Sequence, residues 1–217
     1  TDRIRTRFLV IGSGVAGLHA AWRASAHGPV TVLTKRTLFD SATAYAQGGI
    51  AAALGAGDSP DLHRQDTLAA GAALCDAAAV QVLVEEGPAR VRELQAAGAR
   101  FDLDPDGDFK LGKEAAHSRH RIVHAHGDQT GAEVARTLVA KVRESPNIQV
   151  VEMARVLDLL EDACQGLLRH VEATPAERDD IARAVARGYI PVDLEDLGLG
   201  VEVFFRRGKH HVAAVGF

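Results

Sequence analysis

Ten residues near the middle of the chain, 117–126, hold the densest set of side chains that could do chemistry. They read His-Ser-Arg-His-Arg-Ile-Val-His-Ala-His, with four histidines and two arginines. Histidines can bind a metal, but no His-Glu-x-x-His helix and no nearby cysteine accompanies them. The segment can instead be a solvated basic loop. It can also line a site for an anionic small molecule, because arginine and histidine bind carboxylates.

A second chemical signal is the glycine triplet Gly12, Gly14 and Gly17, which follows the apolar run Phe-Leu-Val-Ile at 8–11. In a dinucleotide-binding turn the first glycine permits the tight turn, the second lets the backbone approach a pyrophosphate, and the third lets the helix pack closely. The start of that helix offers N–H groups and a positive dipole end to the phosphates. The spacing predicts a dinucleotide site, and a strand–helix turn without a ligand is the alternative.

Two further segments bear on the ligand. Lys35 follows the second apolar run, where dinucleotide-binding folds often place an acidic residue for the ribose hydroxyls. This argues against a plain NAD site and leaves either a cation near the phosphates or a solvated lysine. Residues 37–49 are mostly small and end in Gly48-Gly49. Such a long loop is usually functional, and glycines let the main chain lie against a ligand, although a plain surface loop is the alternative.

The elements that must position these residues have the order of an α/β fold. Apolar runs predict parallel strands at 8–11, 29–34 and 148–152, with a further strand at 154–160. Periodic patterns predict helices at 15–25, 61–74, 76–97 and 130–144. Pro88 should divide or kink the third of these helices. Thr130 and Glu133 indicate a capping box, and residues 104–108 indicate a turn between short strands rather than a calcium loop.

Composition narrows the class of protein. The chain has 217 residues, of which 47% are hydrophobic and 25% charged, and its formal net charge is −4. That balance argues against a general nucleic-acid or anionic-membrane binder. Cys75 and Cys164 form neither a disulfide framework nor a metal-ligand set, which fits a reducing compartment. No apolar run could span a membrane and no signal peptide is visible, so we expect a cytoplasmic protein.

The order of several motifs resembles a known family. Residues about 7–162 are similar to the N-terminal part of the L-aspartate oxidases, relatives of the succinate dehydrogenase and fumarate reductase flavoproteins. The segments that carry the resemblance are 10–18, 43–52, 66–76, 114–124, Thr130-Gly131 and 146–148.

The resemblance implies FAD as the cofactor. It would be bound without a covalent bond, because Ala42 stands where the succinate dehydrogenase type often carries the flavin-linked histidine. The residues that the resemblance assigns to FAD are Gly12, Ser13, Gly14, Val15, Ala16, Gly17, Lys35, Thr43, Ala44, Tyr45, Ala46, Gln47, Gly48 and Gly49. Glu114 matches the glutamate that family members place near the substrate amino group, and His117 would border the same pocket.

The implied activity is the FAD-dependent oxidation of L-aspartate to iminoaspartate, with electrons passing to oxygen or fumarate, in de novo NAD biosynthesis. Quinolinate synthase would be the pathway partner. A succinate/fumarate-type oxidoreductase and a catalytically silent flavin-binding remnant are the alternatives. The family's second half, with its capping domain and proton-shuttling arginine, is not recognisable after Gly166.

We therefore expect a Rossmann-like FAD-binding domain with a parallel sheet at 1–166, truncated relative to the family. A small segment at 167–217 should follow, with a helix from Thr174 to Arg187 and a β-hairpin over 201–215 that turns near Gly208. Residues 181–215 faintly resemble the C-terminal module of glycine-cleavage aminomethyltransferases.

Overall fold

The computed structural model describes residues 3–159, 201–206 and 211–216. The expected domain boundary at 166 and the expected helix at 174–187 lie outside these ranges. The chain divides into two compact units, residues 1–40 with 139–217 and residues 41–138. In the described part of the chain, none of the helices combines the length and apolar character needed to cross a membrane.

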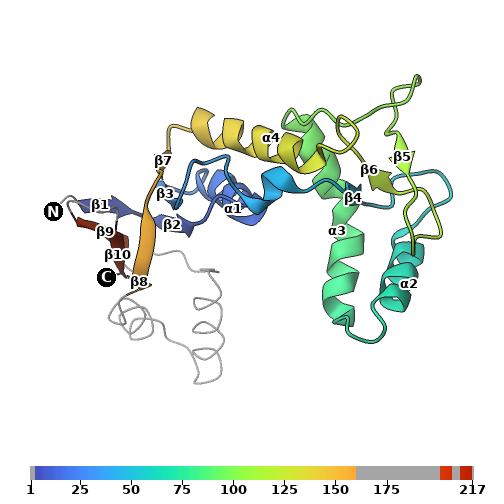
Figure 1. Ribbon diagram of the computed structural model, residues 1–217, viewed down its shortest axis with the longest axis horizontal. Helices are drawn as coiled ribbons and strands as arrows, with labels where there is room; N and C mark the ends of the chain where they lie inside the picture. The colour runs from blue at the N-terminus through green and yellow to red at the C-terminus, as the bar shows by residue number, and fades with distance from the viewer. Residues whose placement is uncertain (1–2, 160–200, 207–210, 217) are drawn as a thin grey trace. The chain divides into compact units, whose positions relative to one another are not determined.

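A parallel sheet forms the centre of the first unit. Strand β3 (Val30–Leu33) lies between β2 (Phe8–Ile11) and β7 (Ile148–Val151), and both neighbours run parallel to it. All four residues of β3 are buried, as expected for the central strand of a parallel sheet. Helix α1 (Val15–Ala24) packs against β2 and β3 (Figure 1). The three predicted parallel strands and the predicted first helix are thus confirmed.

A second sheet in this unit joins the start of the chain to its end. Its strand order is β1 (Arg3–Thr6), β9 (Val201–Arg206), β10 (His211–Gly216) and β8 (Arg155–Leu159). The antiparallel pairing of β9 with β10 confirms the two paired strands of the predicted hairpin, whose turn near Gly208 lies outside the described residues. β1 pairs antiparallel with β9, and β8 pairs parallel with β10.

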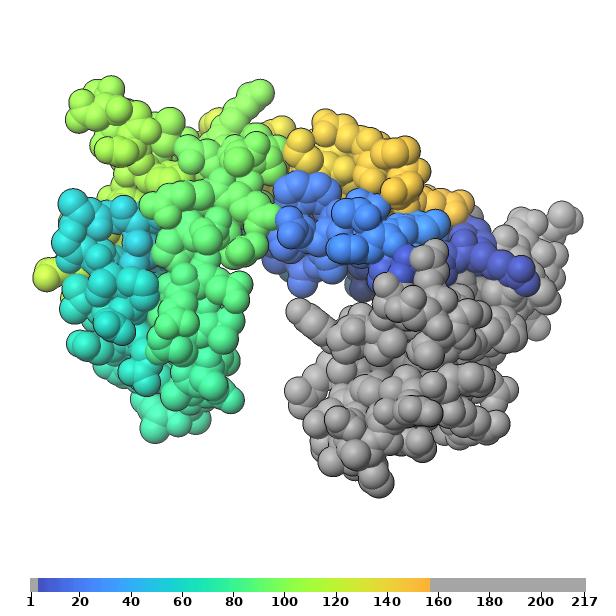
Figure 2. All heavy atoms as spheres, turned by 180° about the vertical axis from the view of Figure 1, so that it is seen from behind, coloured from blue at the N-terminus to red at the C-terminus, as the bar shows by residue number. Residues whose placement is uncertain are grey.

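In the second unit, helices α2 (Pro60–Ala70) and α3 (Ala77–Ala96) pack against each other, and their atoms form one continuous surface (Figure 2). Ser59 caps α2 by accepting a hydrogen bond from the Leu62 N–H at 3.2 Å. The helix ends earlier than predicted, because Ala72 and Ala73 adopt positive φ angles. Pro88 does not divide α3, which continues through it.

A small antiparallel sheet of the second unit places β6 (Ile122–Val123) between β4 (Ile50–Ala51) and β5 (Leu111–Gly112). The short helix η1 (Ala42–Tyr45) precedes β4. An isolated antiparallel bridge between Leu103 and Phe109 encloses the predicted turn at 104–108 and confirms it.

Helix α4 (Thr130–Glu144) has the predicted extent but not the predicted capping box. The Thr130 Oγ1 accepts a hydrogen bond from the Ala125 N–H. The buried Glu133 carboxylate binds the Arg100 N–H at 2.6 Å and the Arg136 guanidinium instead of reaching back to the helix start. The prediction was wrong because the Glu133 carboxylate binds Arg100, which lies before the helix, and Arg136, one turn further along it.

Candidate functional site

The glycine triplet forms the predicted turn between β2 and α1. Gly12 has a φ of +106°, and its N–H donates to the Leu33 carbonyl at 2.8 Å. A Cβ on Gly17 would collide with the Gly12 carbonyl oxygen, so the close packing of helix and strand requires glycine there. Gly12 itself has open space around its missing Cβ. The turn therefore leaves room at the carboxyl end of β2.

This turn fits a pyrophosphate. The N-cap of α1 is Gly14, which brings no side chain to the helix end, and the first turn of the helix has no acidic residue. A negative group placed there would meet backbone dipoles and no carboxylate. Ser13 is held in the turn by a buried hydrogen bond between its Oγ and the Thr34 Oγ1 at 3.0 Å. A pyrophosphate could therefore approach the backbone without displacing a side chain.

Lys35 lies in the same unit and at the same edge of the sheet. It follows Thr34, the hydrogen-bond partner of Ser13, and its side chain is exposed. Because parallel strands end at a common edge, the glycine turn and Lys35 come together here. The fold thus places Lys35 at the same edge of the sheet as the glycine turn.

The other predicted cofactor residues, 43–49, belong to the second unit. Residues 45–49 are exposed. The Gly131 N–H donates to the Ala46 carbonyl at 2.9 Å, and a Cβ on Gly131 would collide with the Thr43 carbonyl. Gly131 therefore lets the start of α4 lie directly against η1. Gly49 has a φ of +93° and enters β4.

Glu114 and His117 lie in the segment 113–120, which connects β5 to β6. The Arg121 N–H closes this segment by donating to the Gly112 carbonyl at 3.0 Å. Glu114 is exposed and has no side-chain partner among the described residues, whereas His117 is half-buried. The segment between β5 and β6 therefore carries both side chains, with Glu114 exposed to solvent and His117 partly buried.

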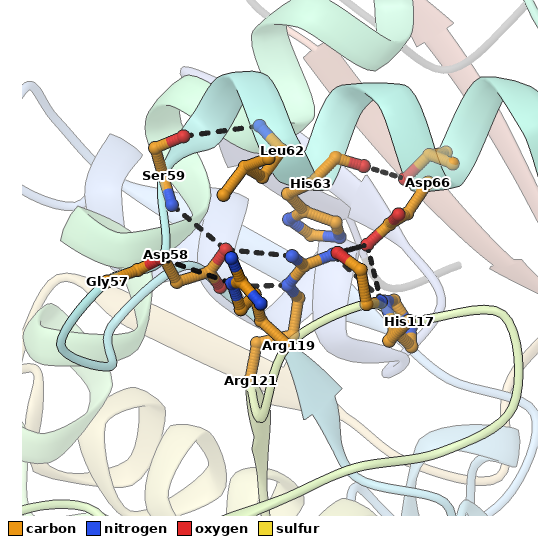
Figure 3. Close-up of polar contacts among 11 residues, drawn as sticks. Gly57, Asp58, Ser59, Leu62, His63, Asp66, His117, Arg119 and Arg121 are labelled. Carbon is orange, nitrogen blue, oxygen red and sulfur yellow. Dashed lines mark hydrogen bonds and ion pairs between the residues drawn. The ribbon is translucent and has the colours of Figure 1, made fainter.

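Arg121 anchors this segment from within the unit (Figure 3). Its side chain is fully buried and binds both carboxylate oxygens of Asp58, Nε at 2.8 Å and Nη2 at 2.7 Å. Its Nη1 donates to the Asp66 Oδ2 at 2.7 Å and contacts the His117 Nδ1 at 3.2 Å. The Ser118 N–H and Oγ both donate to the same Asp66 oxygen at 2.8 Å. The guanidinium is therefore used inside the protein and does not face a ligand.

The charges in this cluster shift several pKa values. The hydrogen bonds from the Ser118 backbone and side chain, with those from Arg121, lower the pKa of Asp66 to about 2. Burial opposes the charge on Arg121, but the hydrogen bonds that it donates to Asp58 and Asp66 outweigh this and raise the Arg121 pKa. Burial, and then the positive charge of Arg121, lowers the pKa of His63, whose ring centroid lies 5.6 Å from that of His117.

The sequence patterns missed Asp58, His63 and Asp66 as partners of the basic segment. They lie more than fifty residues before it, on α2 and the preceding turn, and no local spacing links the two regions. Among the described residues, no group of three or more histidine, cysteine, aspartate or glutamate side chains is arranged to hold a metal ion.

A family model described as FAD binding domain matches residues 7–191. An L-aspartate oxidase of Streptomyces coelicolor is 55% identical over 156 residues, which are 71% of this chain and 27% of the relative. An L-aspartate oxidase of Caulobacter vibrioides is 41% identical over 208 residues, or 89% of this chain and 41% of the relative. This chain thus spans well under half the length of either relative.

Among solved structures, Mycobacterium smegmatis Sdh1 in complex with UQ1 superposes with a TM-score of 0.68 and 33% sequence identity. The superposition covers 73% of this chain and 29% of the Sdh1 chain.

Proposed function

Because this chain belongs to the FAD-binding domain family, we propose that it is the FAD-binding part of an L-aspartate oxidase. The observation that carries the proposal is the turn at Gly12–Gly17, whose backbone is arranged for a pyrophosphate and lies beside Lys35. The identity to L-aspartate oxidases over most of the chain supports aspartate as the substrate. We assign the cofactor to residues 12–17, Lys35 and residues 43–49.

In this proposal bound FAD supplies the two-electron acceptor for the oxidation of L-aspartate to iminoaspartate. The chain's own contribution is to bind and orient FAD and the substrate. The α1 N-terminus and Lys35 would neutralise the pyrophosphate, and Gly48 and Gly49 would lie against the flavin. Glu114 would receive the substrate ammonium group, which distinguishes an amino acid from a plain dicarboxylate. Its exposure and the lack of a partner among the described residues leave its carboxylate available.

A succinate/fumarate-type oxidoreductase is the second candidate. The structural similarity to Sdh1 supports it, since that likeness covers most of this chain. Glu114 argues for the amino acid, because a carboxylate near an uncharged carbon of succinate would find no cation to bind. We also propose a cytoplasmic location, which the free thiol of Cys75 supports, and quinolinate synthase as the pathway partner.

The test has two stages. The purified chain is first titrated with FAD, and binding is followed by flavin fluorescence and the visible spectrum. L-aspartate or succinate is then added without oxygen. We expect FAD to bind and L-aspartate, but not succinate, to change the flavin spectrum. Glu114→Gln should weaken the aspartate response while leaving FAD affinity unchanged.

Three other results are possible, and each would overturn one part of the proposal. A chain that stays colourless after FAD addition and gel filtration overturns the cofactor assignment. A response to succinate alone favours the second candidate. Bound FAD that responds to neither compound identifies a flavin-binding part without activity of its own.

A further inference from the structure

The Nη1 nitrogen of Arg121 carries two hydrogens, and both have partners. One donates to the Asp66 Oδ2 at 2.7 Å, and the other faces the His117 Nδ1 at 3.2 Å. A guanidinium only donates hydrogen bonds and stays protonated in proteins. The contact with His117 is therefore a hydrogen bond only if Nδ1 offers a lone pair.

This requirement fixes the tautomer of His117. A neutral imidazole carries one proton, so a lone pair on Nδ1 leaves the proton on Nε2. With a proton on Nδ1, two N–H groups would point at each other. Arg121 cannot turn away, because Asp58 holds its Nε at 2.8 Å and its Nη2 at 2.7 Å and the side chain is fully buried.

The Nε2–H of His117 is not used within the described part of the protein. No described residue makes a hydrogen bond or ion pair with Nε2, and the side chain is only half-buried. The neighbouring His63 ring is buried, and burial and the positive charge of Arg121 lower its pKa. Two hydrogen bonds from Ser118 to Asp66 hold the backbone next to His117.

We propose that Arg121 is a positioning residue that holds His117 with its proton on Nε2. We further propose that this N–H donates to a carboxylate of the amino-acid substrate. The second part rests on the proposed function above. Glu114 and His117 would then bind groups of opposite charge on the same substrate molecule. Glu114 accepts a hydrogen bond from its ammonium group, and His117 donates one to its carboxylate.

The tautomer is measured directly by nitrogen NMR of the chain labelled at its histidine rings. The spectrum is recorded at about pH 8, above the usual pKa of histidine. His117→Gln identifies the His117 signals among those of the ten histidines. We expect an unprotonated-type signal for Nδ1 and a protonated-type signal for Nε2. The reverse pattern in the unmodified chain, or averaged signals from both tautomers, would overturn the proposal.

Arg121→Lys tests whether Arg121 fixes the tautomer of His117. Lysine keeps the positive charge but lacks the fixed fork of donors, so it cannot bind both oxygens of Asp58 and also reach His117. The two His117 signals should move toward averaged values. Arg119→Lys is the matched control, because within the described residues the Arg119 side chain makes one hydrogen bond, to the Gly57 carbonyl at 3.3 Å. Unchanged His117 signals in a folded Arg121→Lys chain would contradict the positioning role.

The ligand part is tested on the FAD-loaded chain with L-aspartate. We expect the His117 Nε2–H signal to shift on addition of L-aspartate, and the signals of the exposed His120 to stay in place. A chain that binds FAD but shows no His117 response overturns the carboxylate contact. A chain that does not bind FAD fails the proposed function, while the tautomer measurement stands independently.

Discussion

Gly49 and His124 approach so closely that a side chain on the glycine would meet the imidazole. A Cβ on Gly49 would lie 3.0 Å from the His124 Cε1 and 2.6 Å from the Ile122 Cγ2. Gly112, on the other side of β6, is closer still, since a Cβ there would lie 2.7 Å from the His124 Nε2. Two glycines on opposite sides of β6, one just before β4 and one in β5, thus make the space that the histidine occupies.

Gly49→Ala should therefore destabilise the chain. Its φ of +93° disfavours any residue with a Cβ, and the new methyl would meet Ile122, the Val123 carbonyl and His124. Overpacking of this kind costs about 1–3 kcal/mol. Urea unfolding of the variant should give a lower midpoint with an unchanged slope. A midpoint equal to that of the unmodified chain would contradict the close packing.

Gly48→Ala should behave differently, and it tests the cofactor assignment. A Cβ on Gly48 would meet no atom within 4 Å, so the free energy of unfolding should change by less than about 0.5 kcal/mol. If Gly48 lies against the flavin, the methyl should weaken FAD binding by about tenfold or more. Flavin fluorescence measures this. Wild-type FAD affinity in a stable Gly48→Ala chain would remove Gly48 from the cofactor site.

Gly17→Ala should cost both stability and FAD affinity. The new Cβ would collide with the Gly12 carbonyl oxygen and push α1 away from the turn that receives the pyrophosphate. We expect a loss of about 1–3 kcal/mol in the free energy of unfolding. Gly87→Ala in α3 is the matched control. A Cβ there has open space, and alanine in a helix interior should be neutral or stabilising by up to about 1 kcal/mol.

Stability should fall in acid in two separate pH ranges. The folded pKa of His63 is lowered from 6.5, so the unfolded chain binds a proton first and stability declines as the pH falls below 6.5. The pKa of Asp66 is lowered from 3.8 to about 2, so its contribution is lost as the pH falls between those values. Urea midpoints measured across the pH range check both. His63→Leu should flatten the upper range and leave the lower one.

Glu133→Gln should destabilise the start of α4. The buried carboxylate accepts from the Arg100 N–H at 2.6 Å and from Arg136 at 2.6 Å and 2.8 Å, and an amide would present a donor to these donors. The loss should be about 1–3 kcal/mol in the free energy of unfolding. Glu144→Gln is the control, since its Lys141 contact is exposed and 3.4 Å long. Equal effects of the two substitutions would contradict the assigned role of Glu133.

The elements with local signals were predictable. Apolar runs identified β2, β3 and β7, and the glycine spacing identified the turn before α1, because these features depend on neighbouring residues. The hairpin of β9 and β10 followed from the same kind of pattern. Pro88 shows the limit of a local rule. Its helix continues through it, with Val84 and Val91 buried on either side.

The contacts of charged side chains were not predictable, because they join distant parts of the chain. The composition of residues 117–126 suggested metal, solvent or anion binding, yet Arg121 is neutralised by Asp58 and Asp66. Glu133 has the spacing of a capping box, but Arg100 and Arg136 bind it. Arg136 is a neighbour one turn along the same helix, but Arg100, Asp58 and Asp66 come from distant parts of the chain, and sequence spacing carries no information about them.

The pairing of β1 with β9 constrains the order in which the chain can fold during synthesis. Arg3 is synthesised about 200 residues before its partner Phe204. At roughly 5–20 residues per second, β1 waits on the order of 10–40 s for its neighbour. Throughout that time the unpaired backbone groups of β1 can pair with strands of other chains. We therefore expect β1 to promote aggregation during synthesis.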